Sequence, residues 1–235
     1  MAIPVLIVPT LYHYDLLQNM LDSVDWPVEH VVVIDNGGEL KACSCPQASK
    51  VSIVSLPSNI GVAGAWNLGI KLTPFATWWL IANDDILWTP GKLESYEKYI
   101  GPNTIVADWV PLTAFCGFAI DQQTIQEVGL FDEFYYPGCG EEVNYWARAR
   151  SRNIHAIDIP NAYTLQGTAG RTRSEMQQKY PRMSGITTQN LAEGVASGGR
   201  MRGWDLERRR LSDPTVRIDA LTTGDMTPVE NPSQQ

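Results

Sequence analysis

Apolar residues follow two alternating patterns over the first 160 positions of the chain. Short apolar runs predict buried strands at residues 3–8, 30–34 and 51–55, and a fourth strand that starts at residue 78. Apolar residues at helical spacing predict helices at residues 14–24 and 62–72. Because strands alternate with helices, we expect an α/β protein with a doubly wound, mainly parallel central sheet flanked by helices.

The alternation continues into the second half of the chain. It predicts helices at residues 92–100, 122–128 and 141–152, and strands at 105–107, 114–120 and 155–159, with an aromatic loop at 131–140. Apolar periodicity fades from residue 167, where one candidate helix lies around 173–180. We therefore expect a folded domain over residues 1–166, a helical or lid-like extension over 167–211, and a disordered tail over 212–235.

Charge narrows the set of partners. The 235 residues include 18 basic and 26 acidic ones, a net charge of -8, which argues against bulk binding to nucleic acid or anionic lipid. The first 170 residues carry a net of -10, whereas the remainder is about +2 and arginine-rich. That positive segment suits a surface contact, but a solvated arginine-rich helix explains it equally well.

Targeting and zinc-site signals are weak. The apolar run at residues 3–8 has no basic segment before it and is interrupted by Pro9, so it is too short for a signal peptide or a membrane span. Of the four cysteines only Cys43 and Cys45 are close, and with three scattered histidines they do not make a zinc site. We expect a cytoplasmic protein with reduced thiols.

The fourth predicted strand ends abruptly at Asn83, Asp84 and Asp85. In open α/β sheets, ligands bind beyond the carboxyl ends of the strands. Adjacent carboxylates repel each other and are easier to keep ionised beside a divalent cation and an anionic substrate. A polar turn with no ligand is the competing interpretation, because Asn and Asp often close strands.

Two more polar sites are expected at this edge of the sheet. Pro9 and Thr10 follow the first strand, and Asp35 follows the second. A nucleotide lying along the edge could place its base near these residues and its diphosphate near Asp84 and Asp85. Further along, Glu141 and Glu142 open a predicted helix. They are candidates for catalysis, or else simple helix N-terminal acids worth under about 1 kcal/mol each.

Seven segments in order resemble glycosyltransferase family 2, which has the GT-A fold. Together they span about residues 3 to 160, and the likeness is greatest to the rhamnosyl- and galactosyl-transferase-like branch. The segments are residues 7–10 (IVPT), 33–37 (VIDNG), 59–69 (NIGVAGAWNLG), 80–85 (LIANDD), 115–117 (FCG), 128–133 (VGLFDE) and 140–148 (GEEVNYWAR).

The resemblance implies a donor site for a nucleotide-diphosphate sugar. It implies that Thr10, with the preceding Pro9, and Asp35 contact the nucleobase and ribose. A further set of residues would shape the donor site: Asn59, Gly61, Asn67, Asn83 and Asp84. The nucleotide-binding half would cover about residues 1–86 and the acceptor half about 87–166.

The resemblance also implies a metal and a base. Asp85 aligns with the metal-binding carboxylate, and the cofactor would be Mn²⁺ or Mg²⁺. Asn83 stands where a first Asp is frequent, and Gln166 stands near a position where a histidine often helps to hold the metal. Glu142 matches the catalytic base and Glu141 the acid that precedes it. One base without an opposing carboxylate nucleophile implies single displacement with inversion.

We therefore expect an inverting hexosyltransferase that uses a UDP- or dTDP-type donor and an acceptor hydroxyl on a glycan, protein or lipid. Two alternatives stay open. A nucleotidyltransferase with a related sheet would need a Gly-rich, basic loop after its first strand, and residues 7–14 lack such a loop. A catalytically silent nucleotide-sugar-binding module is favoured if Asn83 and Gln166 signal loss of the metal site.

Overall fold

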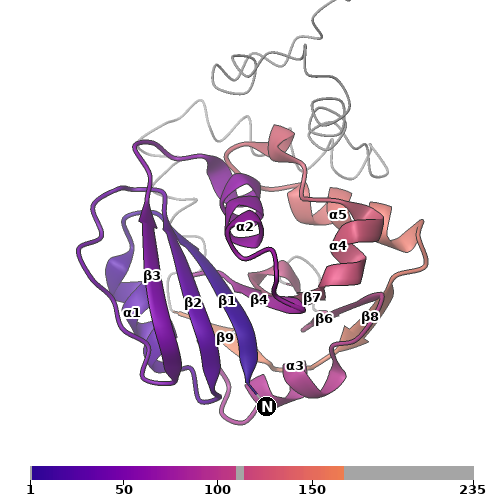
Figure 1. Ribbon diagram of the computed structural model, residues 1–235, viewed down its shortest axis with the longest axis horizontal. Coiled ribbons are helices and arrows are strands. Elements are labelled where there is room, and N and C mark those ends of the chain that lie inside the picture. The colour runs from indigo at the N-terminus through magenta and orange to yellow at the C-terminus, as the bar shows by residue number, and fades with distance from the viewer. Residues whose placement is uncertain (1, 110–113, 167–235) are drawn as a thin grey trace, which may run out of the picture.

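The computed structural model describes residues 2–109 and 114–166. Seven strands form one sheet in the order β3-β2-β1-β4-β7-β6-β8 (Figure 1). Their bounds are β1 Ile3–Thr10, β2 Val28–Asp35, β3 Ala48–Ser55, β4 Trp78–Ala82, β6 Thr104–Ala107, β7 Gly117–Asp121 and β8 His155–Asp158. A separate antiparallel pair joins β5, Ile86–Trp88, to β9, Tyr163–Leu165. The expected α/β fold with a mostly parallel central sheet is confirmed.

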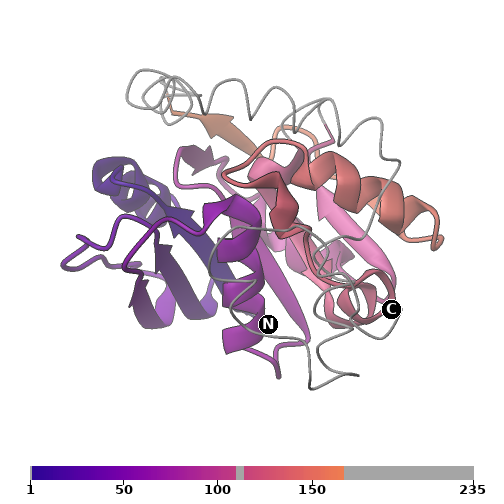
Figure 2. The same cartoon turned by 90° about the horizontal axis from the view of Figure 1, so that it is seen from above.

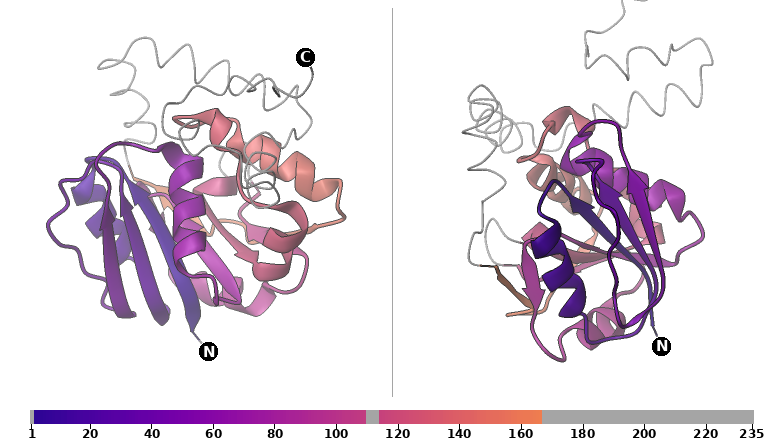
Figure 3. Two further views of the ribbon diagram at one scale, coloured as in Figure 1. Left: turned by 45° about the horizontal axis from the view of Figure 1, so that its top comes forward. Right: turned by 90° about the vertical axis from the view of Figure 1, so that its left-hand side faces the viewer.

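Helices cover both faces of the sheet. Their bounds are α1 Tyr14–Asp22, α2 Gly61–Leu72, α3 Leu93–Tyr99, α4 Gln122–Val128 and α5 Glu141–Arg150, with 3-10 turns η1 Ala114–Cys116 and η2 Glu133–Tyr135. In Figure 3, right, α1 and α2 lie on opposite sides of the first strands. Figure 2, seen from above, shows α5 beside the strands of the second half of the described chain. The molecule is thus a three-layer α/β/α sandwich.

Alternating residues of β1 explain the two layers. Leu6 and Val8 belong to one apolar cluster with residues of α1, α3 and β5. Val5 and Ile7 belong to a second cluster with residues of α2, α4 and α5. Successive side chains of a strand point to opposite faces, so an apolar run without polar interruption identifies a strand covered on both sides.

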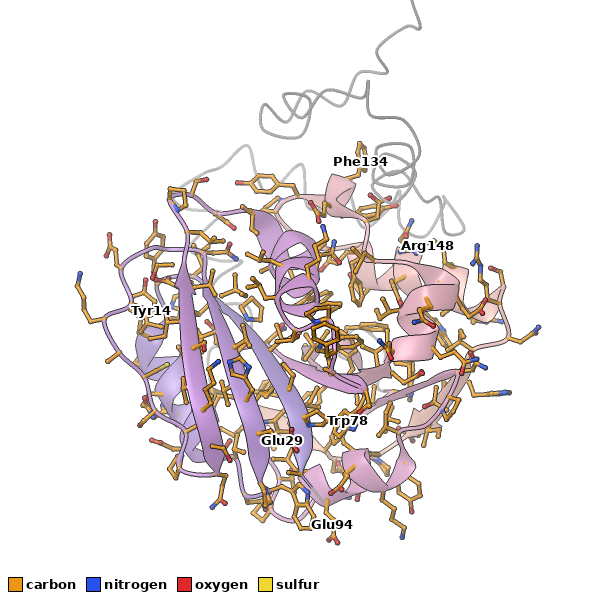
Figure 4. All side chains as sticks on the ribbon, in the orientation of Figure 1. Tyr14, Glu29, Trp78, Glu94, Phe134 and Arg148 are labelled. Atoms are coloured by element: carbon orange, nitrogen blue, oxygen red, sulfur yellow. The ribbon has the colours of Figure 1, made fainter. Side chains whose placement is uncertain are left out.

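The strand order places a switch point between β1 and β4. From β1 the chain adds β2 and then β3 on one side, and then crosses to add β4 on the other side of β1. All four strands are parallel, so their carboxyl ends share one edge. In Figure 4 the labelled Phe134 lies at this upper edge, and Glu29 and Glu94 lie near the opposite edge. Ligands of open α/β sheets bind at such a switch point.

Several expectations need correction. β7 is antiparallel to both β4 and β6. The strand expected at 114–120 begins at Gly117, because η1 precedes it. The short strands β5 and β9 were not expected, and β9 follows β8 in the chain. The candidate helix at 173–180, the extension 167–211 and the tail 212–235 lie outside the described residues.

Candidate active site

Asp84 lies at the switch point, next to the end of β1. Only 8% of its surface is exposed. Burial, reinforced by the charge of Asp85, raises the pKa of Asp84 to about 7. The Thr10 hydroxyl is close enough to oppose part of this shift, although Thr10 Oγ1 completes no hydrogen bond of good geometry within the described residues. The expected neighbours Thr10 and Asp84 are therefore brought together.

Asp85 carries an unsatisfied carboxylate oxygen. Its Oδ1 is buried and has no hydrogen-bond partner among the described residues. Burial raises the pKa of Asp85, while its own backbone amide and the charge of His13 oppose that rise. A buried oxygen without a donor costs about 1–3 kcal/mol, or more when it is charged. Such an atom fits a divalent cation, because Mn²⁺ and Mg²⁺ take carboxylate oxygens and complete their shells with water and phosphate.

Cys116 connects the turn after β4 to the start of α5. Its carbonyl accepts a hydrogen bond of 2.8 Å from the Asn83 amide, and its thiol interacts with the Asn83 side chain. Burial raises the pKa of this thiol to about 12, and the charges of Asp85, Glu142 and Glu141 add to the shift. The charges of Asp85 and Glu141, which are 56 residues apart in the chain, thus both raise the pKa of the same thiol.

The two glutamates that begin α5 have different environments. Glu141 is 5% exposed, its Oε2 has no hydrogen-bond partner among the described residues, and burial raises its pKa well above the usual range. Glu142 is half-buried, and its Oε2 accepts a 2.8 Å hydrogen bond from the Gly140 amide. Gly140 has a φ of 104°, which favours glycine. Burial therefore disfavours the charged form of Glu141, whereas the side chain of Glu142 is held by a hydrogen bond to the chain that enters α5.

The loop before α5 is anchored on two sides. The Val62 amide at the start of α2 donates to Pro137 O at 3.0 Å, and the Phe131 ring stacks on Tyr145 of α5 with centroids 4.1 Å apart. Arg148 of α5 donates to Val128 O at 2.7 Å and to Leu130 O at 2.8 Å. These contacts fix the path of the chain into Glu141 and Glu142.

Asp35 is enclosed by the fold. It is fully buried, its Oδ1 accepts from Tyr14 Oη at 2.9 Å and from the Gly37 amide at 3.0 Å, and its Oδ2 accepts from the Leu40 amide at 2.8 Å. Burial and the hydrogen bond to Asp35 raise the pKa of Tyr14 to about 12. The carboxylate therefore organises the turn after β2, and direct contact with a nucleotide stays a prediction.

The residues expected to shape the donor site divide into two groups. Asn59 Oδ1 accepts from the Gly61 amide at 2.8 Å and so orders the entry to α2. Gly61 has a φ of 80°, and a Cβ there would lie 3.0 Å from the Tyr136 ring. Asn67 instead donates to Phe131 O at 2.9 Å and to Glu133 Oε1 at 2.7 Å, while its Oδ1 accepts from the Phe131 amide. Asn67 thus fastens α2 to the 131–133 loop, and its amide is fully occupied.

Gln166 is also fully occupied. It is 7% exposed, its Nε2 donates to main-chain carbonyls, and its Oε1 accepts from Asn19 Nδ2 at 3.2 Å. The Gln166 side chain therefore links the main chain of the Asp84–Asp85 turn to α1. Among the described residues there is no group of three or more His, Cys, Asp and Glu side chains that could hold a metal. A metal here would depend on Asp85 and on substrate oxygens.

Three residues at the site were not singled out from the sequence. Cys116 was noted only as a free thiol within a motif, His13 only as one of the scattered histidines, and Asn19 not at all. His13 is buried and its charge reaches Asp85. Their sequence signal is weak because each meets the site only through contacts between distant segments.

Known proteins resemble this chain in structure only. No protein-family profile and no curated protein sequence matches it. S. aureus TarS superposes with a TM-score of 0.53 and 15% identity, covering 76% of this chain and 39% of TarS. The fold is GT-A. The catalytic domain of Drosophila beta1,4-galactosyltransferase 7, in complex with xylobiose, gives a TM-score of 0.49 and 11% identity over 67% of this chain and 65% of that one. This GT-A chain spans less than two thirds of the length of either protein.

The described residues of this GT-A domain contain no helix long and apolar enough to cross a membrane. All four cysteines lie within the described residues, and all are free thiols.

Proposed function

We propose that the protein is an inverting glycosyltransferase that moves a sugar from a uridine or thymidine diphosphate donor to an acceptor hydroxyl. The observation that carries the proposal is the buried, unpaired Oδ1 of Asp85 just after β4 at the switch point, together with the hydrogen-bonded Glu142 at the start of α5. A transferase of this kind needs one acidic group near the leaving diphosphate and another near the attacking hydroxyl. The GT-A fold and the switch point between β1 and β4 support the location of the donor.

Glu142 is the proposed base. An acceptor hydroxyl has a far higher pKa than a carboxylate, so Glu142 takes the proton while the new glycosidic bond forms. The bond between the anomeric carbon and the phosphate oxygen breaks at the same time, and the nucleoside diphosphate leaves with both electrons. Glu141 is less suited to this role, because it is almost fully buried and burial disfavours its charged form. Base assistance of this kind is worth roughly 10² to 10⁴ in rate.

Asp85 is the proposed ligand of Mn²⁺ or Mg²⁺. A divalent cation bound there, when present, supplies positive charge to the leaving diphosphate. Asp85 offers its unsatisfied Oδ1, and Asn83 keeps the turn attached to Cys116. With a single base and no described carboxylate nucleophile assigned to the opposite face of the sugar, we propose single displacement with inversion. The acceptor is a hydroxyl of a glycan, a protein or a lipid.

A panel of nucleotide sugars tests the proposal. The full chain is incubated with UDP-, dTDP- and GDP-sugars in Mn²⁺, Mg²⁺ or EDTA, and released nucleoside diphosphate is measured. We expect metal-dependent release from at least one uridine or thymidine donor, with loss of that release in Glu142→Gln but not in Glu29→Gln, which changes an exposed residue near the opposite edge of the sheet. Failure of every donor to release diphosphate in either metal would refute the proposal.

A second candidate is a nucleotide-sugar-binding module without catalysis. The complete occupation of the Gln166 amide by protein groups, together with the uncharged Asn83, favours it. Such a module would be stabilised against heat by a donor, since a ligand bound only to the folded state raises the melting temperature. Stabilisation without release of diphosphate would assign this second function.

A further inference from the structure

Gln166 joins three parts of the chain that meet behind the acidic turn. Its Nε2 donates to Leu16 O in α1 at 2.9 Å, to Ile86 O in β5 at 3.1 Å and to Asp84 O at 3.3 Å. Its backbone amide donates to Asp85 O at 2.8 Å. One residue thus binds carbonyls on Asp84, Asp85 and Ile86 from a position 80 residues later in the chain.

The contacts define the orientation of the amide. Three carbonyl oxygens face the nitrogen, and the Asn19 side chain donates to the oxygen at 3.2 Å. Reversing the amide would set an oxygen against three carbonyls and a nitrogen against an N–H group. Only a side chain with two N–H donors and one acceptor at this reach satisfies all of these partners.

The same turn presents the atoms that the proposed reaction uses. The carbonyls of Asp84 and Asp85 face Gln166, whereas Asp85 Oδ1 is buried and has no partner among the described residues. Without the Gln166 side chain, the part of the chain that the structure describes would hold the main chain of the turn on this side through the short ladder between β5 and β9 and the bond from the Gln166 backbone amide to Asp85 O. The turn could then rotate until the unpaired carboxylate oxygen reached water.

We propose that Gln166 is a positioning residue that holds the Asn83–Asp85 turn so that Asp85 presents its unpaired oxygen to a cation and diphosphate. This proposal rests on the proposed function. Gln166 binds the back of the turn and does not itself ligate the metal. It also ties the turn to α1, because Leu16 O and the Asn19 side chain both belong to that helix. Groups that orient a ligand commonly change metal affinity by 10- to 100-fold when removed.

A set of full-length variants separates positioning from direct ligation. Gln166→Met removes the donors at similar volume, and Gln166→His offers the metal an imidazole while losing one donor. Asn19→Ala changes an exposed residue whose side chain donates to the oxygen of the Gln166 amide. Thr73→Val is the matched control, since Thr73 makes hydrogen bonds with Gly69 O and Trp79 Nε1 at the opposite edge of the sheet.

The first measurement needs no metal and no catalysis. Hydrogen exchange should become at least tenfold faster at the amides of residues 83–86 in Gln166→Met, and two- to threefold faster in Asn19→Ala. Thr73→Val should leave these amides unchanged. Equal exchange in the wild type and Gln166→Met would overturn the proposal, whether or not the protein proves to transfer sugars. If Gln166→Met does not fold, Asn19→Ala alone decides, and unchanged exchange there counts against the proposal.

The second measurement is Mn²⁺ affinity in the presence of UDP, followed by the paramagnetic signal of free Mn²⁺. Positioning predicts at least tenfold weaker binding in both Gln166→Met and Gln166→His, and a smaller loss in Asn19→Ala. Tighter binding in Gln166→His, or an equal loss in Thr73→Val, contradicts the positioning role. Failure of the wild type to release diphosphate would reject the proposed function without altering the exchange result.

Discussion

Replacing Asp84 by asparagine should make the protein more stable at neutral pH. Asp84 is 8% exposed, and burial together with the charge of Asp85 raises its pKa from 3.8 to about 7. A group whose pKa is higher in the folded state binds its proton more tightly there. Its stabilising contribution is complete below about pH 4 and is lost as the pH rises through about 7.

The magnitude follows from the size of the shift. Three pKa units correspond to roughly 4 kcal/mol at full ionisation, of which about 2 to 3 kcal/mol is lost between pH 5 and pH 8. The side-chain amide that replaces the carboxyl group in the variant cannot titrate, so this part of the pH dependence disappears. Glu141 shifts in the same direction, but it remains in the variant and cancels in the comparison. Asp85 also remains, and loss of the neighbouring Asp84 charge favours its ionised form, which adds to the stability of the variant at high pH.

Urea denaturation in EDTA at pH 5, 6, 7 and 8 measures the effect. The difference in free energy of unfolding between Asp84→Asn and the wild type should grow in favour of the variant as the pH rises, and should level off near pH 8. A difference that stays constant within about 1 kcal/mol over this range would show that the Asp84 carboxyl is hydrated and that burial at the switch point is not as described.

Three further predictions concern neighbouring residues. Alkylation of Cys116 at pH 8, followed by peptide mass spectrometry, should be about 10³-fold slower than for a free thiol, because the pKa of Cys116 is raised to about 12. Asp85→Asn should speed the alkylation, and an unchanged rate would show that the charge of Asp85 does not affect this thiol. Arg148→Met should lower the free energy of unfolding by on the order of 3 kcal/mol in urea titrations, since it strands two buried carbonyls; a loss under about 1 kcal/mol would mean that water replaces the guanidinium. Gly61→Ala should cost about 1 to 3 kcal/mol because of its φ of 80° and the close Tyr136 ring, whereas Gly101→Ala, with no atom within 4 Å of its Cβ, is the control.

The sequence by itself determined most helices and strands and the edge at which the acidic residues gather. Apolar periodicity is a local property, so it identified β1, β2, α1 and α4 to within a few residues. The direction of parallel strands then placed Thr10 and Asp84 at one edge without any knowledge of side-chain contacts. The resemblance of short segments was enough to suggest the GT-A fold.

Tertiary structure alone decided what each polar residue does there. An apolar run reports burial but not the direction of its neighbour, so the antiparallel β7 and the pair of β5 with β9 were not foreseen. Asp35 and Gln166 were predicted to contact ligands; the structure shows that both also hold partners in other segments, and the ligand contacts stay predictions. Glu141 and Glu142 are chemically identical in the sequence, and only the structure shows that Glu141 is buried with an unpaired oxygen while Glu142 is half-buried and hydrogen-bonded to Gly140. Burial and hydrogen-bond partners depend on segments that are distant in the chain, and local pattern carries no information about them.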